Sequence, residues 1–431
     1  MKEYEDREVE QEAQEVPSIL AKRRLLPGDR VLWVIVAMFF AISMVVVYSA
    51  TSQLGFKGGI AGMGNYLQKH IVTLCLSALL LFACYFMGAK FLRKITTFAY
   101  GSALLMTIAA YFFGDATNDA HRWLDLGFFR FQPSELLKIG TIMLLAARLS
   151  AKHHRIKQIH LLPSTFDIRK WGSRQERDII FDEIFPIVLP IALSCMAILP
   201  AHTSSAIHLY ILSIVILFIA GIRWQELVKL TIVAAVTGLL IIFTIGRGGV
   251  VIQRVTERFG RRDKAKTEQV YVSLQDKYSD SDRSCMAIHN GGLFGVGAGR
   301  SVMRARLTHP ESDYLFAIVV EEFGLLLSFV IVLLYLWLFF RALRIFEKCE
   351  WLYAGLLAVG LALLITSQGF LHIGVTIGFL PETGQNLPFL TQGRTGMFCA
   401  SIAIGIILSI SRQVEQGTLV PPSQQPNNKH I

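Results

Sequence analysis

Residues 31–48 read VLWVIVAMFFAISMVVVY, a stretch that contains no charged side chain. About 20 apolar residues in a helix span the roughly 30 Å hydrocarbon core of a bilayer, so this stretch predicts a membrane-spanning helix. Similar apolar runs occur at 71–87, 207–221, 227–245 and 314–340. A composition of 53% hydrophobic and 17% charged residues is also too apolar for an ordinary soluble domain. The sequence therefore predicts an all-α integral membrane protein.

The spacing of the apolar runs predicts a polytopic bundle of about ten transmembrane helices. The expected spans are 31–48, 70–87, 95–113, 133–150, 184–199, 205–221, 227–245, 313–340, 351–372 and 394–411. We expect residues 1–30 to form a cytoplasmic arm, 31–412 the membrane domain and 413–431 a cytoplasmic tail. The two long connections are a cytoplasmic loop at 151–183 and an extracytoplasmic loop at 246–312, between helices 7 and 8.

The positive charges of the short loops predict this orientation, since short cytoplasmic loops are enriched in Lys and Arg. They also account for much of the net charge of +10, and no soluble basic domain remains, so nucleic acid is not an expected partner. The six cysteines show neither metal-like spacing nor a disulfide framework. The first sixteen residues are mostly acidic and lack an apolar core, so we expect no cleavable signal peptide.

Polar side chains are concentrated at 118–138, NDAHRWLDLGFFRFQPSELLK, between two apolar runs. Polar and ionisable groups at a membrane boundary are costly and usually mark function. Pro133 can begin the following helix, because proline in the first turn loses no hydrogen bond. Farther along, the adjacent Glu321 and Glu322 lie two turns inside an apolar helix and need partners, for which Lys138 and Arg122 are the natural candidates.

The loop at 246–312 carries twelve Lys and Arg residues. Guanidinium groups match the geometry of phosphate, so these cations favour an anionic substrate group, although contact with solvent or lipid headgroups explains any single arginine equally well. Carboxylates between them could act as a general base, which needs only one such group near the reacting hydroxyl. The glycine-dense stretch at 290–300 follows no strand of a βαβ unit, and predicts close approach of backbone to a helix or ligand.

Five motifs in this order resemble the SEDS family of cell-wall proteins, which includes FtsW, RodA and a sporulation homologue. They are RWL at 122–124, FQPSE at 131–135 followed by Lys138, GGLFGVG at 291–297, DYLFAI at 313–318 followed by EEFG at 321–324, and LPETGQNLPF at 380–389. The match runs from the first expected helix to the last. Two departures are PAHTSSA at 200–206 and Arg394, where relatives carry other residues.

The resemblance implies a peptidoglycan glycosyltransferase that polymerises lipid II at the outer face of the bacterial cytoplasmic membrane, at the septum if it is FtsW-like. The implied partners are a class B penicillin-binding protein and divisome or elongasome proteins. In the family a carboxylate after helix 7 is thought to be the general base; here Asp263 is favoured, with Glu268 and then Asp276 as alternatives. The polar residues expected around the site are Arg122, Gln132, Ser134, Glu135, Lys138, Glu321, Glu322, Thr383 and Gln385.

Several interpretations remain open. No cofactor is expected, apart from a divalent cation, Mg²⁺ or Mn²⁺, that could assist the leaving pyrophosphate. A flippase for a polyprenyl-linked sugar is one alternative, but the polar residues are concentrated on one face of the membrane and no inverted repeat is evident. A RodA-type polymerase for side-wall elongation is the second alternative, and a non-catalytic scaffold for a transpeptidase is the third.

Overall fold

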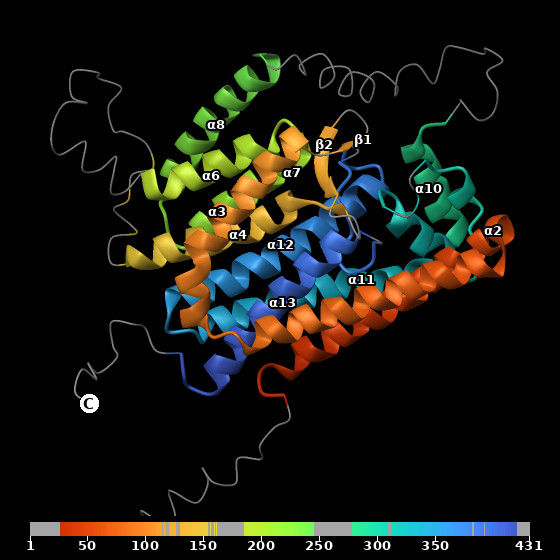
Figure 1. Ribbon diagram of the computed structural model, residues 1–431, viewed down its shortest axis with the longest axis horizontal. Coiled ribbons are helices and arrows are strands. Elements are labelled where there is room, and N and C mark those ends of the chain that lie inside the picture. The colour runs from red at the N-terminus through yellow and green to blue at the C-terminus, as the bar shows by residue number, and fades with distance from the viewer. Residues whose placement is uncertain are drawn as a thin grey trace, which may run out of the picture.

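A computed structural model describes residues 26–113, 115–117, 120–125, 130–153, 156, 159, 161, 185–244, 278–308, 310, 312–381, 383–391 and 393–419. This part of the chain is a helical bundle with a small sheet at one end (Figure 1). The helices are α2 Arg30–Phe86, α3 Ala89–Phe113, α4 Pro133–Ala151, α6 Phe185–Ile198, α7 Thr203–Ile219, α8 Trp224–Thr244, α10 Asp280–Gly291, η3 Met303–Ala305, α11 Leu315–Glu347, α12 Leu352–Thr376 and α13 Arg394–Glu415. The antiparallel strands are β1 Asp115–Thr117, β2 Ala120–Asp125 and β3 Arg130–Phe131.

Helix α2 folds back on itself. As a straight helix its 57 residues would be about 85 Å long. Instead, the ring of Trp33 stacks on Phe82 with 5.6 Å between centroids, and Ser43 Oγ lies 3.2 Å from His70 Nε2. Two antiparallel arms, Arg30–Ser49 and Leu67–Phe86, therefore take the places of the first two predicted spans. The glycine-rich sequence at 55–64 predicts an outer loop between the arms, but its backbone is helical and continues α2.

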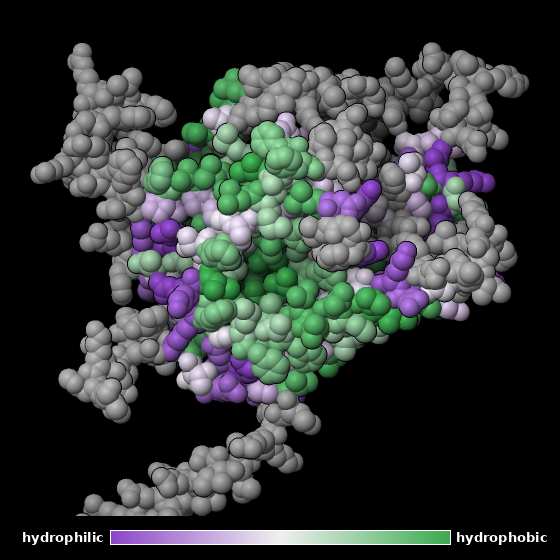
Figure 2. Space-filling view, viewed as in Figure 1, coloured by the Kyte–Doolittle hydropathy of each residue, from purple (hydrophilic) through white to green (hydrophobic). Residues whose placement is uncertain are grey.

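The molecule is a polytopic membrane protein, as predicted. Within the described residues six helical segments are long and apolar enough to cross a bilayer, namely the two arms of α2, then α3, α11, α12 and α13. Helices α4, α6, α7 and α8 occupy the other four predicted spans. Figure 2 shows apolar residues over the middle of this face and hydrophilic residues towards its two ends. Large side chains such as Phe98, Leu105 and Phe329 are exposed, as expected for surfaces that lipid tails cover.

Helix α12 lies at the centre and contacts α11, α4, α13 and α7. Lipid tails are as apolar as leucine, so helices in a membrane associate through close packing, which small residues allow. A Cβ added at Gly360 of α12 would lie 2.6 Å from Ile142 Cγ2 of α4. Likewise, a Cβ at Gly405 of α13 would lie 2.5 Å from the Leu81 carbonyl oxygen of α2. The two glycines therefore allow close packing of α12 against α4 and of α13 against α2.

The start of α2 and the end of α13 are joined by polar contacts. The Gly28 amide donates to Glu415 Oε2 at 2.5 Å, and the Asp29 amide donates to Ser411 Oγ at 2.9 Å. The Asp29 carboxylate accepts from the Val31 amide, which caps α2, and pairs with Arg341 of α11 at 2.5 Å. We call these contacts the terminal clasp. The predicted arm at 1–30 therefore ends in residues that belong to the bundle.

The sequence predicts that 118–138, 246–312 and 374–393 share the outer face, and their described parts lie at the opposite end of the bundle, the α10 end. Gln132 N donates to Thr395 Oγ at 3.2 Å, and Ser284 Oγ donates to the Thr376 carbonyl at 2.6 Å. Residues 280–291 were expected as loop and form α10 instead (Figure 1). The reason is local: Ser279 and Asp282 form a capping box, which satisfies amides at the start of the helix.

Candidate functional site

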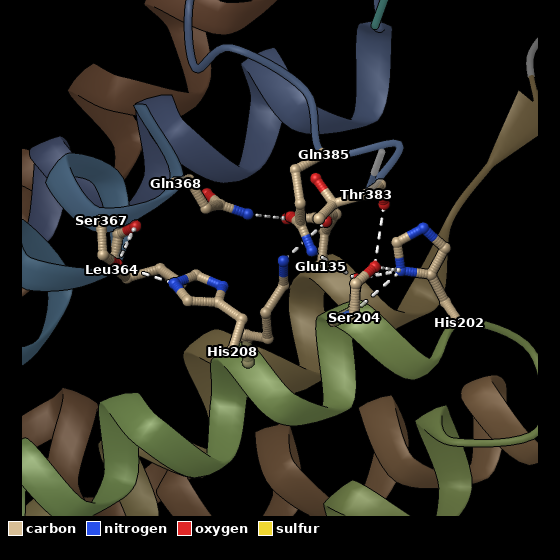
Figure 3. Close-up of polar contacts among 11 residues, drawn as sticks. Glu135, His202, Ser204, His208, Leu364, Ser367, Gln368, Thr383 and Gln385 are labelled. Atoms are coloured by element: carbon tan, nitrogen blue, oxygen red, sulfur yellow. Dashed lines mark hydrogen bonds and ion pairs between the residues drawn. The ribbon is translucent and has the colours of Figure 1, made fainter. Parts of the chain in front are cut away.

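Buried polar side chains form a central network between α4, α7 and α12 (Figure 3). Lys138 Nζ lies 2.7 Å from Glu135 Oε1, and Gln368 Nε2 donates to Glu135 Oε2 at 3.0 Å. Pro133 begins α4, as predicted, and places Glu135 in its first turn with Lys138 three residues later on the same face. Lys138 is completely buried. Since an isolated buried charge is strongly unfavourable, the two groups depend on each other.

His208 of α7 extends the central network. Its Nε2 lies 2.7 Å from Ser367 Oγ of α12, and its ring is buried. Its Nδ1 has no hydrogen-bond partner among the described residues. In Figure 3 the ring lies beside Glu135 and below Gln368. Three helices that are far apart in sequence are thus joined by polar contacts inside the bundle.

The segment after α12 is held against the start of α7. His202 is the N-cap of α7, and its Nδ1 accepts from the Ser205 amide at 3.2 Å and lies 2.5 Å from Ser205 Oγ. Gln385 Nε2 donates to the same Ser205 hydroxyl at 2.8 Å, while Ser204 Oγ donates to the Thr383 carbonyl at 2.8 Å. Thr383 and Gln385, both predicted site residues, therefore lie directly beside α7 (Figure 3).

Glu321 and Glu322 belong to a separate group of contacts, the α10 network. Glu321 accepts from Ser301 Oγ at 2.5 Å and from the Val302 amide at 3.2 Å. Glu322 pairs with Arg304 Nη1 at 3.1 Å and accepts from the Ser49 hydroxyl. Both carboxylates are buried. They join α11 to the segment that follows α10 and to the first arm of α2.

The predicted pairing of Lys138 with Glu321 or Glu322 is wrong. Lys138 has a partner on its own helix, and Arg304 supplies the cation for Glu322. Arg122, the other candidate cation, is placed by its backbone on β2. A carboxylate three residues away on the same helix face can pair with the lysine without any contact to a second helix.

The glycine-dense stretch packs against a break in α11. Gly324 has φ 79° and ψ 176°, so the helix is interrupted there. The carbonyl oxygens of Glu321 and Glu322, freed by the break, accept from the amides of Val296 at 2.9 Å and Gly297 at 3.0 Å. A Cβ at Gly324 would overlap the Leu293 carbonyl oxygen. The predicted close approach of this stretch to a helix is confirmed.

Gly324→Ala is expected to lower the stability of the purified protein by about 3 kcal/mol or more, because the φ/ψ region is essentially restricted to glycine and the methyl group would meet backbone. The matched control is Gly292→Ala. Gly292 also has positive φ, 52°, but a Cβ there meets nothing within 4 Å. With ψ −148°, Gly292 carries backbone strain comparable to that of Gly324 but no overlap, so the control should cost about 1–3 kcal/mol and less than Gly324→Ala. Thermal unfolding in detergent measures both, and equal losses would contradict the proposed overlap.

The structure brings together most of the predicted site residues. Gln132 and Ser134 lie at the start of α4 beside Glu135 and Lys138 of the central network, and Thr383 and Gln385 adjoin the start of α7. Glu321 and Glu322 belong to the separate α10 network. The candidate bases Asp263, Glu268 and Asp276 lie outside the described residues. Among the described residues no group of three metal-ligating side chains occurs, and the divalent cation stays a prediction.

Sequence reasoning missed several members of these networks. They are Ser49, His202, His208, Arg304, Gln368 and His372. His208, Gln368 and His372 interrupt otherwise apolar runs, which is a signal that could have identified them. His372 Nδ1 lies 2.8 Å from the Gln385 carbonyl oxygen, so it too helps to hold the segment after α12.

Comparisons with known proteins agree with this architecture. The family model of the FtsW/RodA/SpoVE cell cycle proteins matches residues 29–416. A probable peptidoglycan glycosyltransferase FtsW from Coxiella burnetii is 28% identical over 391 residues, which cover 89% of this chain and 96% of that protein. Stage V sporulation protein E from Bacillus subtilis is 27% identical over 405 residues, 89% of this chain and 97% of that protein.

Two solved structures share the fold. The rod shape determining protein RodA from Thermus thermophilus superposes with a TM-score of 0.60 at 20% identity, over 90% of this chain and 98% of that one. A chain from a peptidoglycan synthase complex that coordinates polymerization and crosslinking superposes with a TM-score of 0.63, also at 20% identity, with the same coverage.

Proposed function

Because the chain belongs to the FtsW/RodA/SpoVE family of cell cycle proteins, we propose that it is a peptidoglycan glycosyltransferase that polymerises lipid II into glycan strands at the outer face of the cytoplasmic membrane. Curated relatives that match along nine tenths of the chain are named probable peptidoglycan glycosyltransferase FtsW. Their names favour a role in cell division over side-wall elongation.

The reaction needs a base and a stabilised leaving group. The acceptor sugar hydroxyl must lose its proton as it attacks the anomeric carbon of the donor, and one carboxylate is enough for that transfer. Asp263 is our candidate for this base, and Glu268 and then Asp276 are the alternatives. The departing pyrophosphate gains negative charge, which cations of 246–312 other than Arg304, the buried partner of Glu322, can stabilise.

The observation that carries the proposal is the one-sided arrangement of the polar networks. Helix α10 bonds the end of α12, the segment after α12 bonds the start of α7, and the start of α4 bonds the start of α13, all at a single end of the bundle. The other end is closed by the terminal clasp. A transporter moves its cargo between the two sides of the membrane and places its site between them. A site at one end instead suits chemistry on a substrate presented at that surface.

A class B penicillin-binding protein is the proposed partner, since the product is an uncross-linked glycan strand. The similarity in fold to a chain of a complex that coordinates polymerization and crosslinking supports this pairing. Divisome proteins would recruit the pair to the septum.

The function is tested by adding lipid II to the purified protein in liposomes, with and without the candidate transpeptidase. We expect glycan strands, separated by gel electrophoresis and cleaved by a muramidase. The same liposomes report transfer of labelled lipid II between leaflets. Transfer without strand synthesis would contradict the proposal in favour of a flippase, and neither activity in the presence of the partner would favour a scaffold. Adding EDTA to one series shows whether a divalent cation is required.

A further inference from the structure

Two polar contacts mark the ends of a membrane-length stretch. Asp29 pairs with Arg341 at one end of the first arm of α2, and Ser49 donates to Glu322 at the other. The 20 residues from Asp29 to Ser49 correspond to about 30 Å of helix, which is the thickness of a hydrocarbon core. The helix between them, Arg30–Ser49, has a mean hydropathy of 2.7. With the inner boundary of the hydrocarbon taken at Asp29, the Ser49–Glu322 contact lies at its outer boundary.

The chain after α10 reaches this boundary and returns. Ser284, early in α10, bonds the last turn of α12, whereas a Cβ at Gly291 would overlap Val320 of α11. Leu293 and Gly295 then contact Gly324, which is 17 residues, or about 26 Å, from Arg341 along α11. The return path brings Leu307 back to Tyr314 at the start of α11. The deepest point of this turn therefore lies a few ångströms inside the hydrocarbon.

Large apolar side chains are exposed at that deepest point. Leu293 is 60% exposed and Phe294 is 80% exposed. In water, each would forgo about 1.5–3 kcal/mol of transfer free energy, whereas in lipid the exposure has no such cost. Arg300 and Arg306, on the return path, are also exposed. This pairing of apolar side chains at hydrocarbon depth with cations nearby complements a phospholipid, which has acyl chains below a phosphate.

We propose that Leu293 and Phe294 form a lipid anchor that inserts into the outer leaflet and binds the acyl chains of its phospholipids. Arg300 faces the phosphates of the same lipids. The anchor is independent of catalysis.

The test places the photo-crosslinking amino acid p-benzoylphenylalanine at position 294 of the full-length protein in nanodiscs of phosphatidylethanolamine and phosphatidylglycerol. Phe379 is the matched control, because it is the same residue type and is 79% exposed. Gly378 beside it contacts Ser281, ten residues or about 15 Å of α10 above Gly291. It therefore stands well outside the hydrocarbon. The aromatic analogue replaces an exposed ring at both positions, so both variants should fold.

After irradiation, mass spectrometry should detect several-fold more phospholipid adduct at position 294 than at 379, and position 293 should behave like 294. Equal or lower lipid adduct at 294 would overturn the proposal. So would a predominant adduct between position 294 and a co-reconstituted transpeptidase, since the surface would then bind protein. A variant without polymerase activity should give the same lipid adduct, which separates this result from failure of the proposed function.

Discussion

Asp263→Asn is expected to reduce lipid II polymerisation by about 10²–10⁴-fold, the usual contribution of a positioned general base. Asparagine keeps the size of the side chain but cannot accept the proton of the attacking hydroxyl. Asp263→Ala should lose at least as much activity. Both variants should insert into the membrane and unfold at the temperature of the unmodified protein, because other residues form the central network, the α10 network and the terminal clasp. Strand length and yield from fluorescent lipid II measure the effect.

Glu268→Gln and Asp276→Asn are the controls for that assignment. They remove neighbouring carboxylates from the same Arg-rich segment, so a general loss of negative charge would affect all three variants alike. Selective loss at Asp263 supports its role as the base. Full activity of Asp263→Asn together with loss in Glu268→Gln would transfer the role to Glu268.

Lys138→Met should reduce stability and activity together, in contrast to the Asp263 variants. Among the described residues, the substitution leaves Gln368 as the one hydrogen-bond donor to the buried Glu135 carboxylate, and breaking a buried pair from one side costs about 3–5 kcal/mol. The uncompensated carboxylate would lie at the hydrogen bond that joins the start of α4 to α12, so the loss falls on the contact between these helices. Thermal unfolding of the purified protein in detergent measures the stability, and the lipid II assay measures the activity.

The chain offers two controls for this pair. Lys229 bonds Glu226 three residues earlier at 2.9 Å, the same geometry as in the buried pair, but its side chain is 58% exposed. Glu226 is itself buried but also accepts from the Leu161 amide at 3.1 Å, so Lys229→Met should cost less stability than Lys138→Met. In addition, the double variant Glu135→Gln, Lys138→Met removes both charges and should be more stable than Lys138→Met alone. A double variant as unstable as the single one would show that packing, rather than the uncompensated carboxylate, determines the loss.

The number and order of the membrane spans could be predicted because long apolar runs are required by the thickness of the bilayer. Two such runs predicted that the chain crosses the membrane and returns within residues 31–87. Helix α2 does so, although its backbone stays helical between its two arms. Helix α10 was missed for the opposite reason. Its sequence, DSDRSCMAIHNG, is mostly polar and buries only Ser284, Ala287 and Gly291, so it lacks a clear apolar stripe.

The candidate site was predicted as a set of residues but not as a set of contacts. Glu135, Lys138, Glu321 and Glu322 were identified because charges are costly in apolar helices. Their partners depend on how helices rotate and where they break, which no local pattern specifies. Arg304 was one of twelve cations in its loop, and only the break at Gly324 brings it to Glu322.

The terminal clasp has a consequence for the order in which the protein is made. Gly28 and Asp29 leave the ribosome early, but the residues that bind them, Glu415 and Ser411, follow 387 and 382 positions later. Contacts between such distant residues form only after the intervening chain exists. The first helix to be inserted therefore stays without these contacts until the last helix is made. A nascent chain that ends before α13 lacks the helix that packs against α2.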